Sequence, residues 1–323
     1  MRRTFLKAGA ACGVQLMLGA AHAQQASARP MEWVVGFAAG GGSDAVARGV
    51  AEAWAKPLHR NIVVINKPGA GTNIAAEYAA RSRDYGNLVF TADFATLAAN
   101  PHLFPKLAYN AEQDFVPISL LARFPLLLVV NNELPVRSFQ EFAAWARANP
   151  DKLSYGSPGL GTPHHLATEL LAQKMGVKMT HAPYRGAGPA MLDVIGGQIP
   201  FMLVDSAAGL PHINTGKVRA IGVASAQRLK SLPQTPTLIE QGVAGFEAFA
   251  WQGLVAPRGT DDATIQMWSR TLQETLKTPA VQARFEALAL EPLPSTPEQM
   301  REFWLSEKKR WGEVIKTAGI KLD

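Results

Sequence analysis

Short apolar runs of four to seven residues recur along this chain, and segments with helical periodicity separate several of them. Most of the runs are apolar at consecutive positions, as are the strands of a parallel sheet that is covered on both faces. The alternation of such runs with helices is typical of βαβ units and indicates an α/β fold. The predicted strands are 33–37, 62–66, 88–91, 126–131, 153–156, 181–184, 201–205 and 218–224.

Several predicted helices have recognisable starts. Ser43 or Asp44 can cap a helix that follows the first strand. Thr162 precedes a proline and predicts a second helix start. Thr296 and Gln299 form a capping-box pattern before a long final helix. The apolar stripe of that last helix consists of Met300, Phe303, Trp304, Trp311, Val314 and Ile315.

The first residues read as an export signal rather than as part of the fold. Arg2 and Arg3 precede an apolar run of about 14 residues, which is shorter than the ~20 residues that a membrane-spanning helix needs. The run ends in the small-x-small pattern that signal peptidase cleaves, so we expect export and cleavage after Ala23. The paired arginines are compatible with a twin-arginine signal and with a general secretory signal.

The chemistry open to the mature chain is limited by its cysteine and charge content. Cys12 is the only cysteine and lies in the leader, so we expect neither disulfides nor thiolate chemistry. The formal net charge of +6 falls to +3 once Arg2, Arg3 and Lys7 leave with the signal. That charge is too small and too scattered for a nucleic-acid-binding surface. Beyond the leader there is no apolar run of about 18 residues, so we expect no membrane span.

Four glycine-rich loops lie at the ends of predicted strands, at residues 37–44, 66–73, 155–165 and 183–188. Glycine has no Cβ, so such a loop can turn several backbone N–H groups toward one point. The helix that follows adds unpaired N–H groups and the positive end of its dipole. These features predict anion sites beyond the carboxyl ends of the strands, without any charged side chain.

The loop sequences restrict the kind of anion. None of them contains the phosphate-binding pattern G-x-x-x-x-G-K-[ST]. Residues 69–74 begin like the dinucleotide pattern G-x-G-x-x-G but end in isoleucine, so this match is weak and we predict no cofactor. A carboxylate requires only a few N–H donors and fits these loops, although each loop taken alone is also compatible with a simple tight turn.

The same loops resemble those of the Bug family, the tricarboxylate-transporter substrate-binding proteins of Gram-negative bacteria. The resemblance implies a two-lobed periplasmic-binding-protein fold, the type II Venus flytrap, with a mixed β-sheet in each lobe. It also implies a small carboxylate ligand in the cleft between the lobes, and the membrane subunits of a tripartite tricarboxylate transporter as partners. The matching segments are FAAGGGSD (37–44), NKPGAGTNIAAE (66–77), NPHLFPKLAYN (100–110), YGSPGLGTPHHLA (155–167), PYRGAGPAMLDVIGGQI (183–199) and WQGLVAPRGT (251–260).

The resemblance further implies which residues contact the ligand. Asp205 matches an acidic position at the family's cleft, and Tyr184 and Arg185 are expected beside it. Gly36 departs from the proline that the family usually has there, and residues 83–86 depart from its Pro-Asp-Gly-Tyr turn. The implied carboxylate loops consist of Phe37, Ala38, Ala39, Gly42, Ser43 and Asp44 in the first lobe, and of Ser157, Gly161, Thr162 and His165 in the second.

The chain length of 323 residues corresponds to about two domains. We predict a signal at 1–23, a first lobe at 24–127 plus 247–323 and a second lobe at 128–246. We expect Trp251 to lie near the hinge between the lobes. We also expect a monomer.

Other functions find less support in the sequence. His164 and His165 are adjacent, whereas metal ligands on one helix face stand four residues apart, so we expect no metal site. Ser43 and Ser157 lie outside G-x-S-x-G and have no recognisable base, which disfavours an exported α/β hydrolase. A carboxylate sensor for a membrane signalling kinase needs the same two-lobed clamp as a transport protein and stays open as an alternative.

Overall fold

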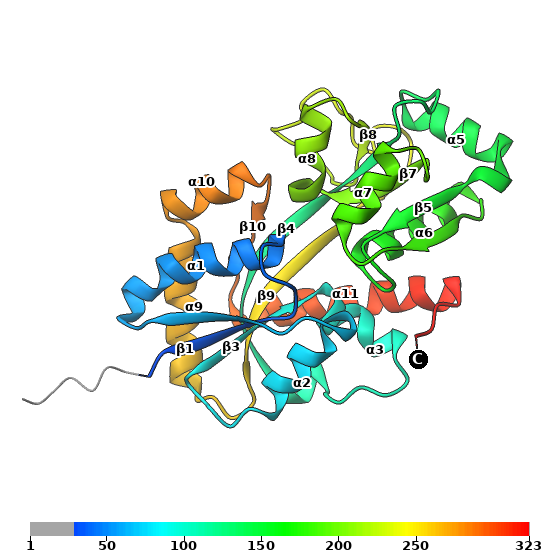
Figure 1. Ribbon diagram of the computed structural model, residues 1–323. Helices are drawn as coiled ribbons and strands as arrows, with labels where there is room; N and C mark the ends of the chain where they lie inside the picture. The colour runs from blue at the N-terminus through cyan, green and yellow to red at the C-terminus, as the bar shows by residue number, and fades with distance from the viewer. Residues whose placement is uncertain (1–28, 323) are drawn as a thin grey trace, which may run out of the picture.

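The computed structural model describes residues 29–322, which form two lobes (Figure 1). The predicted export signal and its cleavage site lie outside the described residues. No helix within residues 29–322 has the length and apolar character that a membrane crossing requires.

The sheet of the first lobe is mixed. Its strands are β1 (Met31–Val35), β2 (Ile62–Asn66), β3 (Leu88–Asp93), β9 (Phe249–Pro257), the first part of β4 (Phe115–Val130) and the short β10 (Glu291–Pro292). They are arranged in the order β2-β1-β3-β9-β4, with β10 also paired to β4. β1 is parallel to both β2 and β3, whereas β9 is antiparallel to β3 and to β4.

The sheet of the second lobe is mixed as well. It contains the last part of β4 together with β5 (Ser154–Ser157), β6 (Thr180–Pro183), β7 (Phe201–Asp205) and β8 (Arg219–Val223). β5 is parallel to β6 and β7, while β7 and β8 are antiparallel to β4. All eight strands predicted from the sequence are present, and a mixed sheet in each lobe confirms the predicted fold class.

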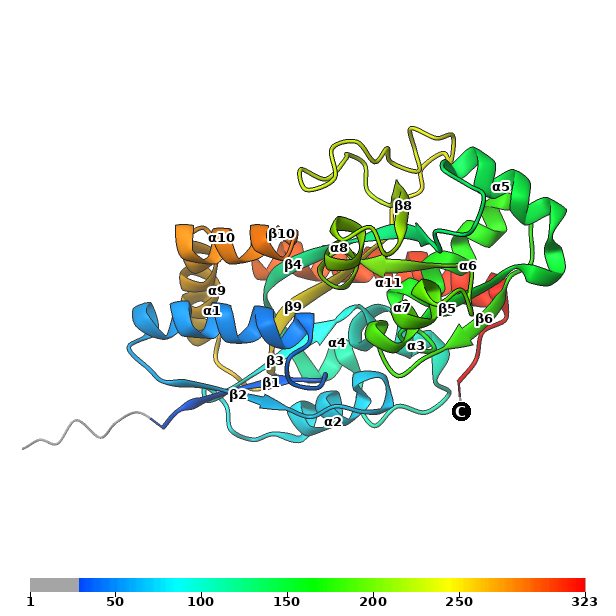
Figure 2. The same ribbon diagram turned by 45° about the horizontal axis from the view of Figure 1, so that its top comes forward.

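The lobes are joined through the 16-residue strand β4. Its pairing passes from β9 at Pro125 to β7 at Leu126, so one continuous strand belongs to both sheets (Figure 2). The sequence reading missed residues 115–125 of β4 and all of β9, because Pro117, Arg123 and Gln252 interrupt their apolar pattern. The lobe boundaries at 127/128 and 246/247 stay a prediction.

Helices cover both faces of the two sheets (Figure 1). In the first lobe the buried core includes Trp33, Trp54 and Trp268 on one face of the sheet, and Phe90, Trp251 and Trp304 on the other. The α-helices are α1 (Gly42–Leu58), α2 (Asn73–Arg81), α3 (Asn100–Leu103), α4 (Ala111–Asp114), α5 (Phe139–Ala148), α6 (Pro163–Met175), α7 (Ala187–Ile195), α8 (Ser206–Asn214), α9 (Asp262–Leu276), α10 (Pro279–Ala287) and α11 (Pro297–Ala318). Two short 3₁₀ helices, η1 (Ala70–Thr72) and η3 (Pro150–Lys152), and one π-helix, η2 (Ala95–Ala99), complete the fold.

Most of the predicted helix starts are confirmed. Thr162 caps α6, and Thr296 with Gln299 forms the complete capping box of α11. The predicted apolar stripe of α11 is buried or packs against the core. The predicted cap of α1 was wrong: Gly41 is the N-cap, with no side-chain hydrogen bond, and Ser43 and Asp44 lie inside the helix.

Candidate functional site

The strand directions place the glycine-rich loops at the junction of the lobes. β3 and β4 point the same way, because each is antiparallel to β9. β7 is antiparallel to β4, so β7 and its parallel neighbour β5 point back toward the first lobe. The carboxyl ends of the parallel strands in both lobes therefore point toward the interlobe region, where ligands of open α/β sheets bind.

The loop after β1 is held by the carboxylate of Asp44, which is 3% exposed. Oδ2 of Asp44 accepts hydrogen bonds from the Gly40 amide and from Arg48 Nε, each at 2.9 Å, and Oδ1 accepts from Asn66 Nδ2 at 2.9 Å. Burial acts to raise the pKa of Asp44, but these hydrogen bonds and the charge of Arg48 outweigh it and hold the pKa below its usual value. Asp44 shapes the loop, and its oxygens are already occupied by protein donors.

The N-terminus of α1 lacks a capping side chain. Within residues 29–322 no acceptor bonds the backbone N–H groups of Gly42 and Ser43, and Gly41 supplies no capping side chain. These donors stand at the positive end of a 17-residue helix, which favours an anion. Ser43 Oγ accepts a hydrogen bond from Gln252 Nε2 at 2.7 Å. The flanking Phe37 is 37% exposed, and Ala38 and Ala39 are exposed.

The loop after β5 is more closed than the sequence indicates. Gly161 has a φ of +73° and donates its amide to Nδ1 of His165 at 3.1 Å. The side chain of Thr162 accepts from the His165 amide, and its hydroxyl donates to the carbonyl of Gly159. The expected ligand donors at Gly161 and His165 therefore bond each other in this structure.

Ser157 and His165 belong to a stacked aromatic cluster. The rings of His165 and His181 are parallel with centroids 3.9 Å apart, and Tyr155 stacks on His181 at 4.9 Å. Ser157 Oγ lies 2.6 Å from His181 Nε2. Burial lowers the pKa of His165 to about 3, with the charge of His181 adding to the effect, and burial lowers the pKa of His181 to about 4. Both rings are therefore neutral at pH 7.

His181 supplies the base that the sequence reading did not find for Ser157. Ser157, however, has no exposed surface, and its hydroxyl also bonds the amide and the carbonyl of Gly159. This arrangement fixes the turn after β5 and leaves the hydroxyl no room to approach a substrate.

Asp205 ends β7 and caps α8. Its Oδ1 accepts from the Ala208 amide at 3.0 Å, and its Oδ2 lies 3.3 Å from Nε2 of His164. Burial acts to raise the pKa of Asp205, but the interactions with His164 and the Ala208 amide outweigh it and lower the pKa. Like Asp44, Asp205 has a structural role, because its carboxylate caps the start of α8.

The fourth glycine-rich loop leads into α7. The Tyr184 hydroxyl donates to Asp193 Oδ2 at 2.6 Å, and burial followed by this bond raises the pKa of Tyr184 to about 12. Arg185 is exposed, and within the described part of the chain it pairs with neither Asp193 nor Asp205. The N–H groups of Ala187 and Gly188 at the start of α7 bond no acceptor in residues 29–322.

The structure adds residues that the sequence did not point to. Gln252 reaches Ser43 from a strand 209 positions later in the chain, and its buried Oε1 bonds nothing in residues 29–322. His181 lies on strand β6, which has no buried residue. The pairing of β6 with β5 brings His181 next to Ser157. No group of three metal-ligating side chains is found among the described residues.

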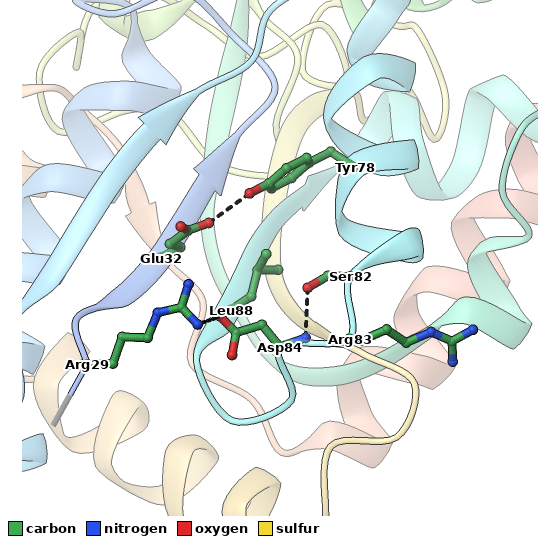
Figure 3. Close-up of a pocket in the computed structure, with 7 residues that line it drawn as sticks. All are labelled: Arg29, Glu32, Tyr78, Ser82, Arg83, Asp84 and Leu88. Carbon is green, nitrogen blue, oxygen red and sulfur yellow. Dashed lines mark hydrogen bonds and ion pairs between the residues drawn. The ribbon is translucent and has the colours of Figure 1, made fainter.

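A surface cavity of about 380 Å³ lies at the edge of the first lobe that is opposite the glycine-rich loops (Figure 3). Its walls come from the starts of β1 and β3 and from the end of α2, so it is remote from the carboxyl-end loops. Tyr78 bonds Glu32 and Arg29 pairs with Asp84 across it, so its charged groups already have partners.

Comparison with known proteins agrees with this geometry. Residues 46–320 match the model of the tripartite tricarboxylate transporter family receptor, TctC. The chain belongs to that family. Protein BugT of Bordetella pertussis is 35% identical over 296 residues, which cover 91% of each chain.

Solved structures of similar proteins share the TctC-family fold. R. palustris Rpa4515 with adipate is 32% identical, with a TM-score of 0.84 over 90% of this chain and 98% of that one. MatC from Rhodopseudomonas palustris with bound malate is 32% identical, with a TM-score of 0.79 over 88% and 98%. The periplasmic binding protein BugD is 33% identical, with a TM-score of 0.80 over 90% and 98%. The predicted two-lobed periplasmic-binding-protein fold and the predicted family are thereby confirmed.

Proposed function

We propose that this TctC-family protein binds a small carboxylate between its lobes as the periplasmic receptor of a tripartite tricarboxylate transporter. The observation that carries the proposal is the uncapped N-terminus of α1, where the amides of Gly42 and Ser43 are open at the junction of the lobes. The names of two relatives, one with adipate and one with malate, support a carboxylate as the ligand class.

In the second lobe, two segments could contact the ligand. The start of α7 offers the amides of Ala187 and Gly188 next to Arg185, which pairs with no carboxylate among residues 29–322. The second segment is the loop that contains Ser157, Gly161, Thr162 and His165. This loop can bind the ligand only if the hydrogen bond between Gly161 and His165 breaks. A ligand that contacts both lobes only when they are close shifts the population toward the closed form.

We infer a binding protein rather than an enzyme, because Ser157, the serine with a nearby imidazole, is buried and fully hydrogen-bonded. Export with cleavage after Ala23 completes the proposal and would bring the chain to the periplasm.

The proposal is tested by thermal unfolding and calorimetry of the mature chain with adipate, malate, citrate, benzoate and aspartate. At least one acid is expected to raise the unfolding midpoint, by the equivalent of about 2.7 kcal/mol at a ligand concentration of 100 Kd. Adipamide is the matched control, since it has the carbon chain of adipate without the charge. A flat response to every acid, or an equal response to adipamide, contradicts the proposal.

A further inference from the structure

A second cavity lies beside the part of β4 where the two lobes join. Its volume is about 710 Å³. One wall is the loop 225–231 of the second lobe, the other is the segment 282–292 of the first, and the floor includes Arg123, Pro125 and Phe249. We call this cavity the hinge groove.

The position of the hinge groove follows from strand register. Arg123 pairs with Trp251 and Pro125 with Phe249, so these side chains share one face of β4 and β9. The other face carries Phe124, which lies against Gly42, and Gln252, which bonds Ser43. The floor of the hinge groove therefore lies on the opposite face of β4 and β9 from Gly42 and Ser43, and none of the residues that line the groove belongs to the proposed carboxylate cleft.

The floor of the hinge groove contains the positively charged side chain of Arg123, which pairs with no carboxylate of the described residues. The Arg123 guanidinium stacks on Phe249 at 4.7 Å from the ring centroid. Its Nε is buried and has no partner in residues 29–322. No carboxylate of the described residues lies within 4.0 Å of it. A half-buried charge without a partner is unfavourable, and a carboxylate of a ligand would relieve this.

The floor also contains the negatively charged side chain of Glu247. Glu247 is half-buried, and its carboxylate forms no ion pair or hydrogen bond with any residue from 29 to 322. The other charged side chains, Arg228, Lys230, Glu286 and Glu291, are exposed at the rim, and Arg228 pairs with Glu240 outside the hinge groove. Arg123 and Glu247 thus carry opposite charges, and neither is paired within the described part of the chain.

The rest of the lining is mainly apolar. Leu229, Phe285 and Leu290 are buried side chains of the walls, and Ala289 and Pro292 lie beside them. Small-molecule sites are concave, mostly apolar and contain a few fixed polar groups, with volumes of roughly 300–1,000 Å³. We propose that the hinge groove binds a small zwitterion with an apolar body, an α-amino acid with an aliphatic side chain, whose carboxylate meets Arg123 and whose ammonium meets Glu247.

The test uses L-norleucine as the ligand and the full mature chain, measured by calorimetry and by ligand-observed NMR. Norleucine is expected to bind saturably. Hexanoate and hexylamine, which each carry one of its two charges, are expected to bind about tenfold more weakly or worse. Arg123→Met and Glu247→Gln should each weaken norleucine binding at least tenfold, because each removes one charge-assisted hydrogen bond.

Matched controls separate this site from the rim and from the cleft. Arg228→Met and Glu286→Gln alter rim charges and should leave norleucine affinity unchanged. Gly42→Pro removes an amide of the proposed cleft and should also leave it unchanged, so failure of the cleft proposal does not affect this one. The inference is overturned by absent saturation, by binding that survives Arg123→Met, or by loss of binding in Gly42→Pro.

Discussion

Oδ2 of Asp44 accepts the backbone N–H of Gly40 at 2.9 Å, so a buried carboxylate inside α1 pulls the preceding loop back onto the first turn of its own helix. The same oxygen binds Arg48, and the other oxygen binds Asn66 from the neighbouring strand. The amides of Gly42 and Ser43 stay open because the N-cap, Gly41, has no side chain, and because the Asp44 carboxylate is occupied by Gly40, Arg48 and Asn66.

Asp44→Asn should destabilise the protein by about 1–3 kcal/mol, because a hydrogen-bonded buried charge is replaced by an amide that cannot accept all three donors. Urea unfolding at pH 7 measures the effect. Glu77→Gln is the control, since it breaks the exposed pair with Arg81 and should leave the midpoint unchanged within error. Equal midpoints for Asp44→Asn and the wild type would show that the Asp44 network does not hold the loop.

Gly42→Pro should weaken binding of the carboxylate found in the ligand panel by about 10- to 100-fold, the loss of one charge-assisted hydrogen bond. Proline is tolerated at the first helical position, and Gly41 has the extended backbone that a residue before proline requires (φ −81°, ψ 172°). Gly42→Ala is the matched control, because it adds a Cβ at 3.2 Å from Phe124 but keeps the N–H. Titration calorimetry compares the two variants, and similar affinities would remove Gly42 from the site.

Gly161→Ala should destabilise the protein by more than Gly176→Ala does. Both glycines have a left-handed φ, +73° and +67°, which costs an alanine about 1–2 kcal/mol. A Cβ at Gly161 would also lie 2.5 Å from Cδ1 of Leu103 in the other lobe, whereas nothing lies within 4 Å of one at Gly176. The extra crowding should add about 1–3 kcal/mol. Thermal unfolding gives the difference, and equal losses would mean that Leu103 moves aside freely.

Stability should fall as the pH is lowered from about 6.5 toward 4. The folded protein holds His165 with a pKa of about 3 and His181 with a pKa of about 4. In the unfolded chain both groups take up protons near pH 6.5. Between about pH 4 and pH 6.5 the unfolded state therefore binds more protons than the folded state. The free energy of unfolding rises with pH in this range and reaches its full value above about pH 6.5.

His181→Phe isolates that effect, because it keeps a flat ring beside Tyr155 and removes the titrating group. The slope of the unfolding free energy between pH 4.5 and 6 should decrease by up to about 1.4 kcal/mol per pH unit. His59→Asn is the control: His59 is exposed with a φ of 50°, a conformation that asparagine tolerates. An unchanged slope in His181→Phe would contradict burial as the cause of the lowered pKa.

Local sequence by itself determined most of the regular elements, and it predicted the kind of site that we propose. Apolar runs predicted the strands because side chains buried on both faces must be apolar, and Thr162 and Thr296 marked helix starts because capping is a contact between near neighbours. Glycine-rich loops at strand ends predicted an anion site because backbone donors need no distant partner.

Only the tertiary structure decided which of those donors are open and how the lobes are joined. The Gly161 amide is taken by His165, Ser157 is held by His181 from another strand, and Ser43 is met by Gln252 across 209 positions. Strands β4 and β9 contain proline, arginine and glutamine, and they form because their partners across the sheet supply the hydrogen bonds. These outcomes depend on contacts between residues far apart in the chain, which no local pattern encodes.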